Sequence, residues 1–158
     1  MSDTLGHRRK QCFWGWGYPD EALSAAEVEH LRDMARLIGV SGDALPTPAL
    51  TDFELRAPRI AAPGNLSSIL SDRPYDRASH AYGKSFADLV RLQMRDMPNP
   101  PDWVAFPRSE DDLSALMDFA ASSGAALVPF GGGTSVCGGV EADVPGDYGA
   151  VISVDMQY

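Results

Sequence analysis

The feature that most constrains this chain is a glycine-rich segment, residues 130–139, which directly follows a short apolar run at 125–129. Five of the nine residues from Gly131 to Gly139 are glycine. Because glycine has no Cβ atom, such a backbone can adopt positive φ angles and approach a ligand closely. Its successive N–H groups can form a concave site for an anion, and Thr134 and Ser135 add two hydroxyl donors. The segment therefore predicts a pyrophosphate cradle, although its composition alone is equally compatible with a glycine-rich turn between two strands.

Two common phosphate-binding loops are disfavoured by the residues at fixed positions. A Walker A loop ends in Gly-Lys-Ser/Thr, whereas this segment continues as Thr-Ser-Val-Cys from residue 134. The dinucleotide fingerprint G-x-G-x-x-G, started at Gly131, requires a glycine where the chain has Val136. That fingerprint also opens a helix, and Pro145 and Gly146 would break any helix that followed. We therefore expect the segment to lead through an irregular connection into a strand at 150–154.

Charge is distributed unevenly along the 158 residues. The formal net charge is −9, and residues 109–158 contain eight acidic residues but no Lys or Arg. Because the chain has no basic stripe to neutralise phosphates, nucleic-acid binding is disfavoured. A diphosphate held by the glycine-rich segment must therefore rely on backbone donors or on cations from elsewhere.

Cysteines and histidines are few and scattered. Cys12 and Cys137 provide neither a disulfide framework nor metal-ligand spacing, and we expect Cys137 to pack as a small apolar residue. The three histidines form no H-x-x-x-H pair, so the sequence predicts no metal site. No apolar run reaches the length of a signal peptide core or a membrane span, which favours a cytoplasmic location and leaves peripheral membrane contact open.

Residues 1–98 are predicted to form a helical and extended segment. The sequence S-A-A-E from Ser24 is a capping box at the start of a helix that Gly39 can close. The aromatic turn at 13–18 is expected to pack its rings on the body of the protein. Four prolines make the stretch 40–63 mostly extended.

The second half of this segment contains one ambiguous stretch and one helix. Residues 72–83 are interpreted as a loop with surface ion pairs, and a partly exposed functional segment is the alternative. A second helix is predicted to begin after Ser85 and to run to Met97, where a proline cluster at 98–101 stops it. That cluster is the predicted boundary between two units, 1–98 and 99–158.

After residue 98 the pattern changes to strand, helix, strand. A strand is predicted at 103–106, a helix capped by Ser109 and ended by Gly124, and a strand at 126–130 that leads into the glycine-rich segment. Three acidic residues in the first helical turn are favoured there by the helix dipole. The face expected to be buried consists of Leu113, Leu116, Met117, Ala120 and Ala121.

These segments together resemble a known family. The stretches that carry the resemblance are 104–108, the helix from Ser109, and 128–136. They look like the start of the FAD-binding domain shared by p-cresol methylhydroxylase and vanillyl-alcohol oxidase. Within that superfamily, the segments 15–18 and 77–83 and the G-G-G-T-S form of the loop are similar to the alkyldihydroxyacetonephosphate synthase branch.

The resemblance implies a fold, a cofactor and a set of binding residues. The expected fold is α+β: an N-terminal helical and extended arm, followed by the first β-α-β-loop-β half of an FAD-binding domain of the p-cresol methylhydroxylase type. FAD would be the cofactor, and its diphosphate would be wrapped by backbone amides and two hydroxyls. The residues expected to hold it are Phe130, Gly131, Gly132, Gly133, Thr134, Ser135 and Val136.

The family's FAD-binding domain continues further and is followed by a substrate-binding domain, so we expect this chain to be an N-terminal part of an enzyme and assign no catalytic residue. The synthase exchanges the acyl group of acyl-dihydroxyacetone phosphate for a fatty alcohol, so a small-molecule or lipid-like substrate would bind only the complete enzyme. One alternative is part of an FAD-linked 2-hydroxy-acid oxidase or dehydrogenase. Another is an inactive fragment that pairs with a partner, as a homodimer or with a complementing chain, through an open edge strand at 150–154.

Overall fold

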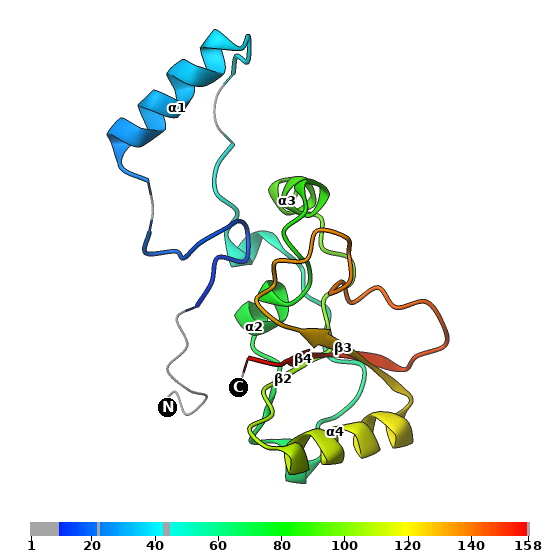
Figure 1. The fold of residues 1–158 in the computed structure, drawn as a ribbon. Coiled ribbons are helices and arrows are strands. Elements are labelled where there is room, and N and C mark those ends of the chain that lie inside the picture. Colours follow the sequence, from blue (N-terminus) through cyan, green and yellow to red (C-terminus); the bar gives the residue numbers. More distant parts are fainter. Residues whose placement is uncertain (1–9, 22, 43–44, 158) are drawn as a thin grey trace.

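The computed structural model describes residues 10–21, 23–42 and 45–157. The described residues form one small mixed sheet with helices on both of its sides, so the predicted α+β class is confirmed (Figure 1). In chain order the elements are α1 (Ala25–Leu37), η1 (Leu50–Asp52), η2 (Gly64–Leu66), β1 (Leu70–Ser71), α2 (Pro74–Ser79), α3 (Phe86–Gln93), β2 (Trp103–Ala105), α4 (Glu110–Ser123), β3 (Ala125–Phe130) and β4 (Ala150–Asp155).

The sheet has the strand order β1-β2-β4-β3. β1 pairs antiparallel with β2, and β4 pairs in parallel with β2 on one side and with β3 on the other. The prediction of an open edge strand at 150–154 is therefore wrong. The connection after β3 returns the chain to the middle of the sheet, and all six residues of β4 are buried there. Among the described strands, β1 and β3 form the edges.

The main core lies between α4 and the sheet. Leu116 and Ala120 are one helical turn apart on α4 and pack with Ile152 of β4, and all three side chains are at most 5 % exposed. Met117 and Ala121, which were predicted to be buried, are exposed instead. Each residue of an α-helix is rotated by about 100° from the one before it, so each of these two side chains turns away from the sheet. The predicted buried face was too wide.

The predicted helix caps are confirmed. The Ser24 hydroxyl accepts a hydrogen bond from the backbone of Glu27, whose carboxylate accepts one from the Ser24 N–H. At α4, the Ser109 hydroxyl accepts a hydrogen bond from the backbone N–H of Asp112, and Gly124 ends the helix in the left-handed conformation with φ of 67°. These ends form as predicted because capping hydrogen bonds involve only residues three or four positions apart.

The stretch 72–83 is not the surface loop that was predicted. It contains α2, and Ala78 and Tyr82 are buried in a second core together with Phe13. Arg77 is also buried, and its Nε donates a hydrogen bond to the carbonyl of Pro101 at 2.7 Å. The polar residues were misleading because a charged side chain such as Arg77 can be buried when a backbone carbonyl far away in the sequence accepts one of its hydrogen bonds.

Other details of the N-terminal segment also differ from the predictions. Of the aromatic turn, Phe13 packs in the second core as expected, whereas Trp16 is 58 % exposed. α3 ends at Gln93 and does not reach Met97, because Arg95 adopts a left-handed φ of 59° that breaks the helix. α1 stands apart from the other elements in Figure 1, and none of its residues is buried.

A buried carboxylate ties the extended arm to the sheet. Asp102 is fully buried, and its two oxygens accept hydrogen bonds from the guanidinium groups of Arg56 and Arg59 and from the backbone N–H of Val151 and Arg59. Burial by itself raises the pKa of Asp102, but these hydrogen bonds outweigh it and hold the pKa well below its ordinary range. These contacts join residues that lie before and after residue 98. The division of the chain into two units at that residue stays a prediction.

Candidate functional site

The glycine-rich segment begins at the carboxyl end of β3, as the sequence predicted. Phe130, the last residue of the strand, is buried, whereas Gly131, Gly132 and Thr134 are exposed. Within the described chain, no protein group accepts a hydrogen bond from the backbone N–H groups of residues 132–134. These donors and the hydroxyl of Thr134 are therefore available to an anion.

Of the glycines at 132 and 133, only Gly133 is required by the fold. Gly133 has a φ of 68°, and a Cβ atom there would lie 2.7 Å from the Phe130 ring, so this glycine is required by the fold itself. A Cβ on Gly132 would meet only the Cγ2 of Thr134, at 3.8 Å, which is an ordinary contact. The protein alone therefore does not require glycine at 132, and close approach of a ligand is a physical reason for one.

The loop is held in shape by residues from the other half of the sequence. The backbone N–H of Lys84 donates to the carbonyl of Ser135 at 2.7 Å. Gly83 lies so close that a Cβ atom there would be 2.2 Å from the same carbonyl oxygen. The glycine at position 83 was the one feature of the sequence that could have indicated a close contact. Nothing in the sequence indicated that Ser135 would be the residue in contact with it.

Lys84 also brings a positive charge to the loop. Its side chain is buried, and its Nζ donates to the backbone carbonyl of Cys12 at 2.9 Å. Burial lowers the pKa of this ammonium group. A pocket of about 160 Å³ lies between the loop and the aromatic turn, and its walls include Lys84, Gly132, Thr134 and Trp16. The pocket beside the loop is thus lined by one basic residue, which lies outside the stretch 109–158.

Cys137 does not pack as the small apolar residue that was expected. It is exposed on the glycine-rich segment, with its Sγ 3.7 Å from the hydroxyl of Ser135. Hydrogen bonding by Ser135, and also by the backbone of Gly139, lowers the pKa of the Cys137 thiol.

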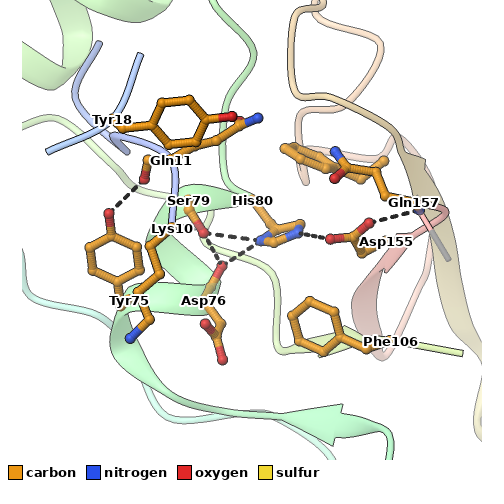
Figure 2. A pocket seen from close by; sticks show the side chains of 11 residues that line it. Lys10, Gln11, Tyr18, Tyr75, Asp76, Ser79, His80, Phe106, Asp155 and Gln157 are labelled. Carbon is orange, nitrogen blue, oxygen red and sulfur yellow. Dashed lines mark hydrogen bonds and ion pairs between the residues drawn. The ribbon is translucent and has the colours of Figure 1, made fainter. Parts of the chain in front are cut away.

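A second pocket, of about 210 Å³, adjoins the start of the glycine-rich segment (Figure 2). It lies beyond the carboxyl ends of β2, β3 and β4, and α2 contributes one of its walls. Its aromatic lining consists of Tyr18, Tyr75, Phe106 and Phe130. Ligands of α/β proteins commonly bind outside the carboxyl ends of parallel strands, so the position is suited to a binding site.

His80 is the central polar residue of this second pocket. Its Nδ1 lies 2.7 Å from the carbonyl oxygen of Asp76 and 3.1 Å from the Ser79 hydroxyl, and its Nε2 points to Asp155 of β4, 3.5 Å from Oδ2 (Figure 2). The imidazole also packs on the Phe130 ring, with centroids 4.2 Å apart. Sequence reasoning named the stretch around His80 only as an alternative functional segment and did not place it beside the loop.

No group of three or more His, Cys, Asp or Glu side chains in the described part of the chain is arranged to hold a metal ion. None of the helices described here combines the length and the apolar character needed to cross a bilayer.

Comparison with known proteins identifies the domain. A family described as an FAD binding domain matches residues 101–157. The chain is 37 % identical over 123 residues to alkyldihydroxyacetonephosphate synthase of Trypanosoma brucei brucei, a match that covers 71 % of this chain and 20 % of the relative. It is 32 % identical over 72 residues to the synthase of Dictyostelium discoideum, covering 46 % of this chain and 12 % of that one. It is 25 % identical over 175 residues to the synthase of Caenorhabditis elegans, covering 95 % and 29 %.

Solved structures show the same fold. Two structures of alkyldihydroxyacetonephosphate synthase superpose with TM-scores of 0.73 and 0.72 at 21 % and 20 % identity, covering 93 % and 97 % of this chain. The chain spans 32 % of each of these structures and between 12 % and 29 % of the curated relatives. Residues 101–157 therefore belong to the FAD-binding domain family, FAD is the cofactor of that domain, and the chain is related over most of its length to the alkyldihydroxyacetonephosphate synthases.

Proposed function

We propose that residues 130–136 hold the diphosphate of FAD. The observation that carries this proposal concerns Gly132. The protein has space for a side chain at this position but has none there, and the backbone N–H of Gly132 has no acceptor among the described residues. The exposed hydroxyl of Thr134 and the buried ammonium group of Lys84 line the same pocket and suit an anion. The Ser135 carbonyl accepts from the backbone N–H of Lys84 and its hydroxyl oxygen accepts from the N–H of Gly139, so Ser135 has its hydroxyl hydrogen to offer to an anion.

We further propose that the complete protein is an FAD-dependent enzyme that exchanges the acyl group of acyl-dihydroxyacetone phosphate for a fatty alcohol. The names of its relatives support this reading over a 2-hydroxy-acid oxidase. In such an enzyme FAD supplies the reactive centre, and the residues described here bind and orient it. Formation of alkyl-dihydroxyacetone phosphate from the acyl compound and a fatty alcohol would support the assignment. Flavin reduction by lactate or glycolate, without that product, would contradict it.

The loop assignment is tested by replacing Gly132 with valine in the complete protein. Because a Cβ atom at this position makes only an ordinary contact, we expect the variant to fold and to lose at least about tenfold in FAD affinity, the equivalent of one or two lost hydrogen bonds to the diphosphate. Flavin absorbance after gel filtration and titration of the apoprotein with FAD measure the change. Gly64→Val is the control, because that glycine has open space around it and lies away from the loop. Unchanged flavin content in Gly132→Val would overturn the assignment.

A further inference from the structure

A buried positive charge lies beside the glycine-rich segment. Lys84 is only 8 % exposed, and its Nζ donates to the backbone carbonyls of Cys12 at 2.9 Å and Phe13 at 3.4 Å. No ion pair of the described residues includes this ammonium group, and Asp88 acts on its charge only from beyond ion-pair distance. A buried charge without an opposite charge beside it is costly. The ammonium group also has three hydrogens for two carbonyls, so an anion bound next to Lys84 would supply both the missing charge and a third acceptor.

The pocket of about 160 Å³ beside Lys84 is lined by two segments that lie far apart in the sequence. The glycine-rich segment contributes Gly132 and Thr134, and the aromatic turn contributes Gly15 and Trp16. The backbone N–H groups of residues 15–17 have no acceptor among the described residues, as is also true of residues 132–134. Unpaired backbone donors are therefore present in both segments that line the pocket, and such donors suit an anion.

Gly15 shares the property that singled out Gly132. A Cβ atom at Gly15 would meet no atom within 4 Å, so the packing of the protein does not require a glycine there. Close approach of a ligand is a physical reason for one. Lys84 holds the two segments in place relative to each other, because its backbone N–H binds the Ser135 carbonyl at 2.7 Å while its side chain binds the aromatic turn and the residue before it.

We propose that the aromatic turn forms the second wall of the diphosphate site, with Gly15 allowing close approach and Lys84 supplying a positive charge. The proposal rests on the proposed binding of the FAD diphosphate by the glycine-rich segment. It goes beyond that assignment because the aromatic turn lies outside residues 101–157, which match the FAD-binding domain family. The N-terminal segment is then part of the cofactor site and not only a support for the sheet.

The test compares aspartate with asparagine at position 15 in the apoprotein of the complete protein. The two side chains have nearly the same size and shape but differ in charge, so a purely structural effect is the same for both. A negative charge on the wall of the pocket repels a diphosphate. Affinities for FAD and for ADP are measured by titration. The same two substitutions at Gly64, which has open space around it and lies away from the loop, control for the change in net charge.

We expect Gly15→Asp to bind FAD and ADP at least about tenfold more weakly than Gly15→Asn does. Gly64→Asp and Gly64→Asn should differ by less than about twofold, because salt screens a charge that lies far from the ligand. Equal affinities of the two Gly15 variants for both ligands would overturn the proposal, and so would a difference at Gly64 as large as the difference at Gly15.

A second measurement leaves Gly15 in place. Trp16 lines the same pocket and is 58 % exposed, so a ligand that contacts the aromatic turn changes the surroundings of its indole. We expect ADP to alter the tryptophan emission of the unmodified apoprotein and most of that change to disappear in Trp16→Phe. An undiminished change in Trp16→Phe would show that the ligand does not reach the turn, which would also overturn the proposal.

The same titrations distinguish this proposal from the assignment of the loop. If Gly132→Val leaves FAD binding intact, the diphosphate assignment fails, and the proposal that rests on it fails as well. If Gly132→Val weakens FAD as expected and the two Gly15 variants bind FAD and ADP equally, only the second wall is refuted and the assignment of the loop stands.

Discussion

Replacement of Asp102 by asparagine is expected to detach the extended arm from the sheet. Each carboxylate oxygen of Asp102 accepts a backbone N–H, Oδ1 from Arg59 at 2.8 Å and Oδ2 from Val151 at 2.7 Å. An asparagine has only one oxygen. Whichever way its amide is turned, its NH₂ group faces one of these N–H donors, and the charge that pairs with Arg56 and Arg59 is lost as well.

The magnitude follows from burial. Removing one partner of a buried ion pair costs about 3–5 kcal/mol of the free energy of unfolding, and because Arg56 and Arg59 are partly exposed we expect the lower end, about 3 kcal/mol. With a urea slope of about 2 kcal/mol/M, the midpoint of unfolding should fall by about 1.5 M. Trp103 fluorescence is a suitable signal, because the indole Nε1 donates to the carbonyl of Ile60 in the same arm.

The control for this prediction is Asp33→Asn on α1. Asp33 also pairs with an arginine, Arg36 at 2.7 Å, but both side chains are 63 % exposed. Exposed ion pairs contribute little to stability, so the midpoint should scarcely move. If the urea midpoint of Asp102→Asn shifted as little from that of the unmodified protein as the midpoint of Asp33→Asn does, the reasoning would be refuted.

The same carboxylate gives a prediction about pH. The folded pKa of Asp102 is depressed, so its contribution to the free energy of unfolding is fully present above the pKa of an aspartate in the unfolded chain, about 3.9. That contribution is lost as the pH falls through the folded value. The difference in unfolding free energy between the unmodified protein and Asp102→Asn should therefore be constant above about pH 5 and should shrink below about pH 4. A difference that persists unchanged in acid would show that the charge of Asp102 contributes nothing.

Two further predictions concern close packing. Gly83→Ala should weaken FAD binding and lower the urea midpoint, because the new Cβ would lie 2.2 Å from the carbonyl oxygen of Ser135. Gly64→Ala, with no atom within 4 Å, is the control, and equal behaviour of the two variants would contradict the prediction. Leu116→Ala should reduce the free energy of unfolding by about 2–5 kcal/mol, because it leaves a cavity under a fully buried side chain. Met117→Ala, at a side chain that is 63 % exposed, should cost far less, and similar costs at both positions would show that the face of α4 is assigned wrongly.

The elements that were predicted correctly depend on neighbours in the sequence. The caps at Ser24, Ser109 and Gly124 involve residues three or four positions apart, and the glycine-rich segment after β3 follows from the absence of side chains at successive positions. The bounds of the three predicted strands were each wrong by one residue at one end. Local propensity limits each of these features to a few arrangements, which is why one sequence is enough to find them.

The elements that were predicted wrongly depend on partners that lie far away in the chain. β4 was taken for an edge strand because its pattern does not indicate which strands flank it. The stretch 72–83 was taken for a surface loop because its sequence does not show that Arg77 is buried, with its Nε bound to the distant carbonyl of Pro101. The predicted buried face of α4 was too wide because the sequence does not distinguish apolar residues on an exposed face from those in the core.

From the amino-acid sequence, a strand, a helix, a second strand and a glycine-rich loop after it could be predicted, and the resemblance to an FAD-binding domain indicated the cofactor. Only the tertiary structure brought Gly83 and Lys84 against Ser135 and placed His80 opposite Asp155. The physical reason is that backbone conformation and capping are decided by neighbouring residues. Packing, burial and the pairing of buried polar groups depend on the path of the whole chain.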